Sequence, residues 1–190
     1  MKDLLNVDLL SINCVNAHAS AAALNYCQKF FNFGKSILVT NQDIEADNIE
    51  LHLIDKLDWN QYNDEVLHLL DHTDNDYVIV IQDDGHIVNG DLWDDEFLKY
   101  DYIGSPWPFE DSWIDRQRED HRQNIRDVFP KNRVGNGGFS LRSKKFLEFS
   151  DQFETRFDPT KHFGWHGSNF ANTPQLMSVK YMGDMAWTKG

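Results

Sequence analysis

The chain has few cysteines, few prolines and no long hydrophobic run. Its two cysteines in 190 residues, Cys14 and Cys27, are too few for a disulfide framework and form no Cys-x-x-Cys pair. Both lie in segments that we expect to be buried, where a cysteine behaves as a small apolar side chain. No apolar stretch approaches the roughly 20 residues that cross a bilayer. The sequence therefore excludes a disulfide-rich scaffold and predicts no membrane span.

Positive charge is also scarce. The chain carries 18 Lys and Arg against 31 Asp and Glu, a formal net charge of −13. Nucleic-acid binding needs clustered basic residues, so we expect no nucleic-acid partner. An anionic ligand would need a local positive group or a bound metal ion to approach. The first residues also lack a basic region followed by an apolar stretch, so no signal peptide is predicted and a cytoplasmic location is the default.

What remains is an ordinary globular composition. Hydrophobic residues make up 41% of the chain and charged residues 26%. This length suits a single domain with a substantial core, so we assign residues 1–190 to one domain.

Predicted strands alternate with predicted helices along the first half of the chain. Apolar runs at 9–15, 36–40, 49–54 and 77–81 predict strands, and helical spacing predicts helices at 17–31 and 61–70. Alternation of this kind indicates βαβ units. We therefore expect an α/β fold with a mostly parallel central sheet flanked by helices.

The second half of the chain is less regular. Helices are predicted at 92–99 and 144–153, and strands at 102–104 and 137–141. Residues 109–133 mix basic and acidic side chains and contain few apolar ones, which predicts a mobile insertion. Residues 158–190 show no clear periodicity and are expected to form an irregular C-terminal segment.

The most informative stretch is the apolar run 78–81, which is followed by Gln82, Asp83, Asp84 and Gly85. Ionised carboxylates at the end of a buried strand are costly to desolvate unless a positive group meets them. Open α/β sheets bind their ligands at the carboxyl ends of strands. We therefore interpret Asp83 and Asp84 as a metal site that faces a phosphate-bearing substrate. The alternative is a plain turn, because Asp and Gly favour turns.

Four motifs resemble a glycosyltransferase-like domain family of unknown function. They are Gln-Asp-Asp-Gly at 82–85, Trp-Asp-Asp-Glu-Phe-Leu at 93–98, Asp-Tyr-Ile-Gly-Ser-Pro-Trp at 101–107 and Val-Gly-Asn-Gly-Gly-Phe-Ser-Leu-Arg at 134–142. The resemblance covers roughly residues 8–150. It implies the fold of the type-A nucleotide-sugar glycosyltransferases, in which an acidic motif binds Mn²⁺ or Mg²⁺ across the donor's diphosphate.

The resemblance implies roles for the acidic residues. Asp84 occupies the position shared with the family and would be the direct metal ligand, with Asp83 helping through water or the ribose. Gln82 stands at the first place of the acidic motif and is assigned to substrate binding. A late histidine often returns to the metal in such enzymes, and His166 is the candidate here.

Further residues are candidates for the donor site. The glycine-rich segment 135–138 would let a sugar lie against the main chain, with Asn136, Gly137 and Gly138 lining it. Asn16 follows the first strand, where this fold receives the nucleotide base. Two tryptophans, Trp107 and Trp165, offer faces on which a sugar could stack, although core packing is an equal alternative for both.

The chain departs from the family pattern after residue 142. Family members usually carry a Glu-Asp pair that supplies a catalytic base, whereas this sequence passes quickly to Lys-His-Phe-Gly-Trp-His-Gly at 161–167. Asp151, Glu154 and Asp158 are the base candidates, and the spacing does not choose among them.

These observations predict a metal-dependent glycosyltransferase of the hexosyltransferase class. It would move a sugar from a nucleotide-diphosphate donor to a glycan, lipid or protein acceptor. Two alternatives stay open: a non-catalytic relative that binds a nucleotide sugar or glycan, and a metal-dependent phosphohydrolase that uses the same carboxylates.

Overall fold

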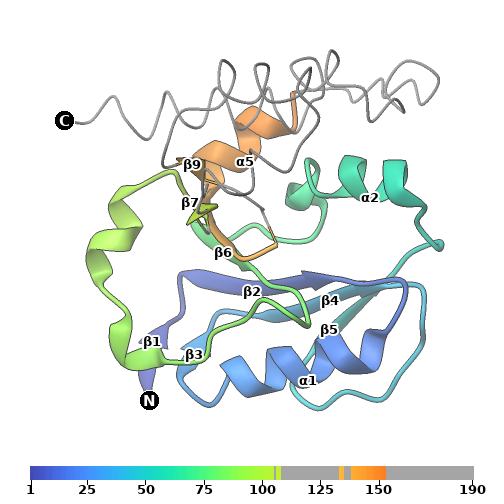
Figure 1. Ribbon diagram of the computed structural model, residues 1–190, viewed down its shortest axis with the longest axis horizontal. Coiled ribbons are helices and arrows are strands. Elements are labelled where there is room, and N and C mark those ends of the chain that lie inside the picture. Colours follow the sequence, from blue (N-terminus) through green and yellow to red (C-terminus); the bar gives the residue numbers. More distant parts are fainter. Residues whose placement is uncertain (105, 108–132, 135–137, 153–190) are drawn as a thin grey trace, which may run out of the picture.

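A computed structural model of the chain describes residues 1–104, 106–107, 133–134 and 138–152. Six strands form one sheet in the order β5-β4-β2-β6-β10-β7. They are β2 (Val7–Ile12), β4 (Ser36–Thr40), β5 (Glu50–Leu53), β6 (Tyr77–Val80), β7 (Tyr102–Gly104) and β10 (Ser140–Ser143). Helices flank this sheet, so the expected α/β class is confirmed (Figure 1).

The remaining described elements are short. Three α-helices are described: α1 (Ala17–Cys27), α2 (Trp59–Glu65) and α5 (Lys144–Ser150). The 3-10 turns are η1 (Leu69–Asp71), η2 (Gly90–Leu92) and η3 (Asp95–Lys99). Two small strand pairs join β1 (Lys2–Leu4) to β3 (Phe31–Phe33) and β8 (Pro106–Trp107) to β9 (Arg133–Val134).

The sheet is mixed, which corrects the expectation of a mostly parallel one. Strands β5, β4, β2 and β6 run parallel, whereas β10 is antiparallel to both β6 and β7. Ser140 of β10 lies opposite Val80 of β6, so the start of β10 meets the end of β6. This register brings the segment before β10 to the edge of the sheet where β6 ends.

Both faces of the sheet are covered, as the continuous apolar strands predict. Leu9 of β2 belongs to the core beneath α1, and the next residue, Leu10, belongs to the core on the other face. Helix α1 lies on the first face, and α2 and α5 lie on the second (Figure 1). Every residue of β2 is buried.

Helix α1 is shorter than the predicted 17–31. It ends at Cys27, and the amide groups of Lys29 and Phe30 then donate to the carbonyls of Tyr26 and Cys27 in a tighter turn. Phe31 begins β3, where it pairs with Lys2 of β1. Phe31 fits the helical spacing only by coincidence. Local periodicity carries no information about its pairing with the start of the chain, so the predicted helix was too long.

Two further helix predictions were wrong in part. The predicted helix 61–70 divides into α2 and η1, because α2 ends at Glu65 and the chain turns before Leu69. Residues 92–99 form no α-helix: Leu92 ends the 3-10 turn η2, and η3 follows after Trp93 and Asp94. Asn89 and Asp94 cap the amide groups of Asp91 and Glu96, which favours single turns over a continuous helix.

Strand bounds agree better with the predictions. Strands β4 and β7 have the predicted bounds, and β6 ends one residue early at Val80. Strand β2 occupies residues 7–12 instead of 9–15, because Asn13 folds the following loop back on itself. Strand β10 starts at Ser140 instead of 137, and α5 ends at Ser150.

Asp8 in β2 is a charged residue inside the core, with a relative exposure of 0%. One carboxylate oxygen accepts from the Lys35 amide at 2.9 Å and from Asn75 Nδ2 at 3.0 Å, and the other accepts from Thr73 Oγ1 at 2.5 Å. Gly34 lies against this cluster. Asp8 therefore ties the turn before β4 to the segment before β6.

Both cysteines are buried and unpaired, as predicted. Burial raises the pKa of the Cys27 thiol to about 11, opposed by its contact with the Ile87 carbonyl. At pH 8 only about one Cys27 in a thousand would then be a thiolate, the form that reacts. We expect iodoacetamide to leave Cys27 unmodified in the native protein and to modify it in urea, as followed by mass spectrometry. Modification of native Cys27 at the rate of a free thiol would contradict this.

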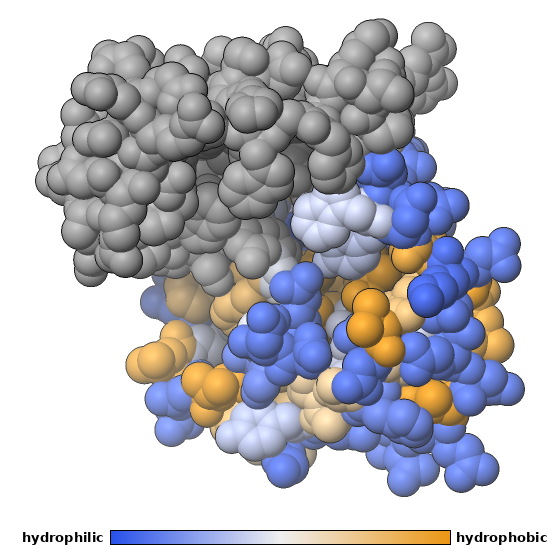
Figure 2. Space-filling model, turned by 45° about the vertical axis from the view of Figure 1, so that its right-hand side comes forward, coloured by the Kyte–Doolittle hydropathy of each residue, from blue (hydrophilic) through white to orange (hydrophobic). Residues whose placement is uncertain are grey.

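The face of the described residues that Figure 2 presents is mostly hydrophilic. Figure 2 shows hydrophilic residues covering much of the visible described face, with hydrophobic ones scattered among them. Within the described residues, no helix has the length and apolar character needed to cross a membrane. The predicted insertion, up to residue 132, and the segment 158–190 lie outside the described residues.

Candidate functional site

The predicted acidic residues lie in a tight turn directly after β6. The amide of Gln82 donates to the carbonyl of Gly85 at 3.0 Å, and the amide of Gly85 donates back at 3.2 Å. Asp83 and Asp84 occupy the two central positions and are exposed. We call residues 82–85 the acidic turn. It presents two adjacent carboxylates to solvent at the end of a strand whose last residues are buried.

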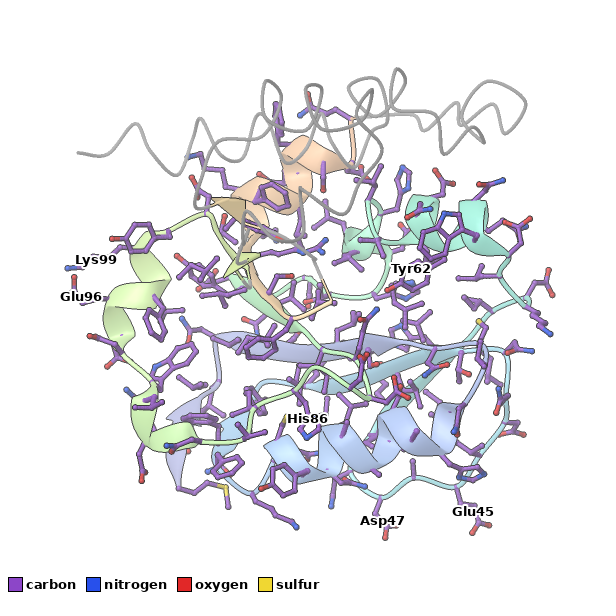
Figure 3. The ribbon with its side chains drawn as sticks, in the orientation of Figure 1. Glu45, Asp47, Tyr62, His86, Glu96 and Lys99 are labelled. Atoms are coloured by element: carbon purple, nitrogen blue, oxygen red, sulfur yellow. The ribbon has the colours of Figure 1, made fainter. Side chains whose placement is uncertain are left out.

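The turn is anchored on both sides. Ile81, which precedes it, is fully buried, and its amide donates to the carbonyl of Leu10 in β2. Gln82 donates from Nε2 to the Tyr62 hydroxyl of α2 at 3.0 Å. In Figure 3, Tyr62 lies between α2 and the sheet. The first residue of the motif is thus held by a helix, which leaves Asp83 and Asp84 as the groups free to meet a cation.

The pKa of Tyr62 responds to the charged groups around this hydrogen bond. Burial raises the pKa of its phenol, and the nearby Asp84 charge adds to the rise. The Gln82 hydrogen bond and the Arg142 charge act in the opposite direction. Arg142 itself is buried on this face of the sheet, and it donates to the carbonyl of Val66 at 3.0 Å. Negative charge at the acidic turn is therefore felt within the core beneath α2.

The local sequence explains why α2 begins where it does. Asp58 accepts from the amides of Asn60 and Gln61, and Gln61 returns a bond from its side chain to the Asp58 amide. This reciprocal arrangement is a capping box, which defines the first turn of a helix. It places Tyr62 one residue after the capped turn, where it can reach Gln82.

The acidic turn stands at the point where the strand order reverses. From β2 the chain moves to β4 and β5 on one side, and then crosses to β6 on the other side of β2. In open α/β sheets, ligands bind in the crevice at the carboxyl ends of the two strands that flank such a point. Here those strands are β2 and β6, so residues 13–16 and the acidic turn border the crevice.

The loop after β2 is rigidly built. The Asn13 side-chain oxygen accepts from the amides of Val15 and Asn16 at 2.8 Å, and its nitrogen donates to Ser20 Oγ at 2.9 Å. Thr40 Oγ1 donates to the Asn13 carbonyl. Asn16 caps α1 by accepting from the Ala19 amide. The candidate base contact, Asn16, is therefore exposed beside the crevice, and its side-chain oxygen is already used as a cap.

The segment before β10 lies against the acidic turn. A Cβ atom placed on Gly85 would meet Phe139 Cβ at 3.7 Å and the Gly138 carbonyl at 3.8 Å. The structure thus brings Gly138 beside the acidic turn. The other two residues of that prediction, Asn136 and Gly137, lie outside the described residues.

The structure describes only some of the other predicted residues. Trp107 belongs to β8, which pairs with β9 through Arg133, and the structure does not describe its side chain. Asp151 directly follows α5, whose Ser150 donates to the Leu67 carbonyl. Four more candidates lie outside the described residues: Glu154, Asp158, Trp165 and His166.

The described residues fit a metal only in part. Among them, no group of three or more His, Cys, Asp and Glu side chains converges on one point. Mg²⁺ is commonly held by one or two carboxylates together with substrate phosphates and water, so two adjacent aspartates suffice as the protein's share. His86 follows the turn but packs edge-on against Tyr26 of α1, with ring centroids 5.6 Å apart. It does not complete a metal site.

Sequence reasoning missed the aromatic residues on α2. Tyr62 was not among the predicted site residues, yet its hydroxyl accepts the hydrogen bond that anchors the acidic motif. Trp59 is 63% exposed and stacks on Tyr62, with ring centroids 6.4 Å apart. A buried tyrosine usually finds a partner for its hydroxyl, which was the available signal. No comparable signal marked Trp59.

Comparison with known proteins identifies one family that the chain resembles. A family model described as "Protein of unknown function (DUF5672)" matches residues 61–189. The matched range begins within α2 and includes β6, the acidic turn and Gly138. No curated protein and no solved structure matches the chain.

Proposed function

The chain belongs to the DUF5672 family, and we propose that it is a metal-dependent glycosyltransferase of the hexosyltransferase class. It would use a nucleotide-diphosphate sugar as donor. The observation that carries the proposal is the position of the acidic turn. Two exposed carboxylates stand at the reversal point of the strand order, where α/β sheets bind nucleotides.

The donor's diphosphate would lie across this crevice. Asp84, assisted by Asp83, would hold Mn²⁺ or Mg²⁺, which when bound neutralises the charge that builds on the departing diphosphate. Helix α1 directs its amino end to the same edge of the sheet, and the positive end of a helix favours phosphate. Although the chain is strongly acidic, the bound metal ion and the amino end of α1 would be two local positive groups that attract an anionic donor.

The sugar and the base would occupy the two ends of the crevice. Gly138 lies beside the acidic turn, where a sugar could approach the main chain. Asn16 lies beyond the other end, with its side-chain NH₂ left to donate to a base because its oxygen caps α1. Trp59 is exposed and stacks on Tyr62, whose hydroxyl accepts the bond from Gln82. It therefore offers a flat apolar face for a sugar ring close to the acidic turn.

Donor binding is the first test of the proposal. We expect one member of a panel of UDP-, GDP- and dTDP-sugars to raise the melting temperature in the presence of Mn²⁺. At about 100 times its dissociation constant, a ligand stabilises the native state by about 2.7 kcal/mol, a shift of several degrees. The variant D84N should lose the Mn²⁺-dependent shift, and D83N should show a smaller one.

A matched control is D47N, which removes the same charge from an exposed site. Figure 3 places Asp47 in the connection between β4 and β5, on the α1 side of the sheet and away from Tyr62. D47N should keep the full shift. The proposal fails if no donor shifts the wild type, or if D84N responds as the wild type does.

Turnover separates an enzyme from a non-catalytic relative. With the binding donor and Mn²⁺, a transferase should release nucleoside diphosphate faster when an acceptor is supplied. Donor binding without any release, across glycan, lipid and peptide acceptors, would favour the non-catalytic alternative.

A further inference from the structure

Four side chains form a continuous chain of hydrogen bonds outside the candidate site. Glu50 and His52 come from β5, Glu65 ends α2, and His72 follows η1. The two imidazoles meet through their Nδ1 atoms, 2.9 Å apart. Each uses Nε2 to reach a carboxylate: His52 contacts Glu50 at 3.0 Å and His72 contacts Glu65 at 2.5 Å.

The carboxylates determine where the protons lie. An ionised carboxylate can only accept a hydrogen bond, so each Nε2 must carry a hydrogen. The lone pairs of the two neutral rings would then face each other across 2.9 Å at Nδ1. A hydrogen bond at this distance requires one further proton between them. Three protons on four ring nitrogens give the pair a single positive charge, which lies between the negative charges of Glu50 and Glu65.

We propose that His52 and His72 share one proton and act as a pH-operated latch that holds α2 and η1 over the edge strand β5. Losing the shared proton sets two lone pairs against each other, or makes His52 give up its bond to Glu50. Gaining a second proton sets two N–H groups and two positive charges against each other. The latch is therefore closed when the pair holds one shared proton. It is weakened at higher pH, where that proton is lost, and at lower pH, where a second proton binds.

The surroundings suit a single positive charge. His72 is buried, with 7% of its side chain exposed, and Glu65 is 22% exposed, so water screens this half of the chain weakly. The bond from His52 lowers the pKa of Glu50, and the Lys35 charge contributes to the same effect. The other ionisable groups nearby have partners of their own: His68 Nδ1 lies 2.9 Å from the Asp64 carbonyl oxygen, and Arg142 donates to the Val66 carbonyl. Asp71 in η1 adds negative charge next to His72.

The latch also touches the element that anchors the acidic turn. Helix α2 carries Glu65 at its end and Tyr62 three residues earlier, and Tyr62 receives the bond from Gln82. Opening the latch would loosen the support of that anchor. The inference itself is independent of the proposed function, because it concerns only how α2 is held.

The sign of the pH dependence follows from proton counts. Histidines in an unfolded chain take up protons near pH 6.5. Well below this pH the unfolded chain binds two protons at these residues against one in the latch, so stability falls with falling pH. Well above it the unfolded chain binds none, so stability falls as pH rises. The contribution of the latch is therefore largest near pH 6.5.

The test compares melting temperatures of the wild type and H52Q from pH 4.5 to 9. We expect the wild type to exceed H52Q by about 2–4 °C near pH 6.5, and the difference to shrink on both sides. H18Q is the control: it removes an exposed histidine of α1 that lies outside the pair, and its profile should parallel the wild type. A constant difference between H52Q and the wild type would overturn the proposal.

A second measurement uses the wild type alone, so it does not depend on whether H52Q folds. ¹⁵N NMR of the wild type should show both Nε2 atoms protonated near pH 6.5 and one proton shared between the Nδ1 atoms. Two Nδ1 atoms without a proton at that pH would overturn the proposal. So would a rise in melting temperature with Zn²⁺ that H52Q lacks, because a metal rather than a proton would then join the rings.

Discussion

Replacing Asp8 with alanine is expected to lower the free energy of unfolding by about 3–5 kcal/mol. The carboxylate is fully buried and accepts three hydrogen bonds, from the Lys35 amide, Asn75 and Thr73. Alanine would remove the shared acceptor of all three donors, of which Asn75 keeps its bond to the Leu5 carbonyl, and would also open a cavity. Because native domains are stable by only about 5–15 kcal/mol, a loss of this size would leave the chain marginally folded.

Urea unfolding followed by circular dichroism would measure this effect. D8N should be less harmful than D8A, because the amide keeps the shape and one acceptor oxygen. D47A is the control for loss of an aspartate, and it should change stability by less than about 0.5 kcal/mol because Asp47 is exposed. Equal stability of D8A and D47A would show that the hydrogen bonds around Asp8 do not support the fold.

The second large effect is expected for Gly34→Ala, which should destabilise the fold by about 3 kcal/mol or more. A Cβ atom at this position would lie 2.4 Å from Asn75 Nδ2, 2.6 Å from the Leu5 carbonyl and 2.7 Å from Asp8 Oδ1. One of these atoms belongs to the backbone, and the others belong to the hydrogen-bonded cluster around Asp8. None can move without breaking a bond that the core needs.

Gly85→Ala provides a matched control, because its new Cβ would meet nothing nearer than Phe139 Cβ at 3.7 Å. The same substitution should therefore cost far less at Gly85 than at Gly34. Melting curves of the two variants would check the contrast. Similar melting temperatures would mean that the segment around Gly34 relaxes at little cost.

These two predictions concern a cluster that sequence reasoning overlooked. Asp8 was included in no predicted site or strand, because one acidic residue beside an apolar run resembles a solvent-exposed strand end. Its partners Lys35 and Asn75 lie 27 and 67 positions away along the chain. No local pattern links residues so far apart.

Local sequence patterns were enough to predict the buried central strands and the position of the acidic turn. Strands such as β4 and β6 are continuous runs of Val, Ile and Leu, because both faces of a central strand must be apolar. Asp83 and Asp84 could be located at the end of β6 because an abrupt change from apolar to charged residues marks the end of a buried strand. Local composition carries this information directly.

Contacts between residues far apart in the chain could not be predicted in this way, because they depend on how the elements pack. The antiparallel direction of β10, the contact of Gly138 with Gly85, the bond from Gln82 to Tyr62 and the pairing of His52 with His72 all join separate elements. The periodicity of a segment records which of its faces is buried, but not what lies against that face. Those partners are selected by packing across the whole sheet, where the free energy of burying one element depends on the shape and charge of its neighbours.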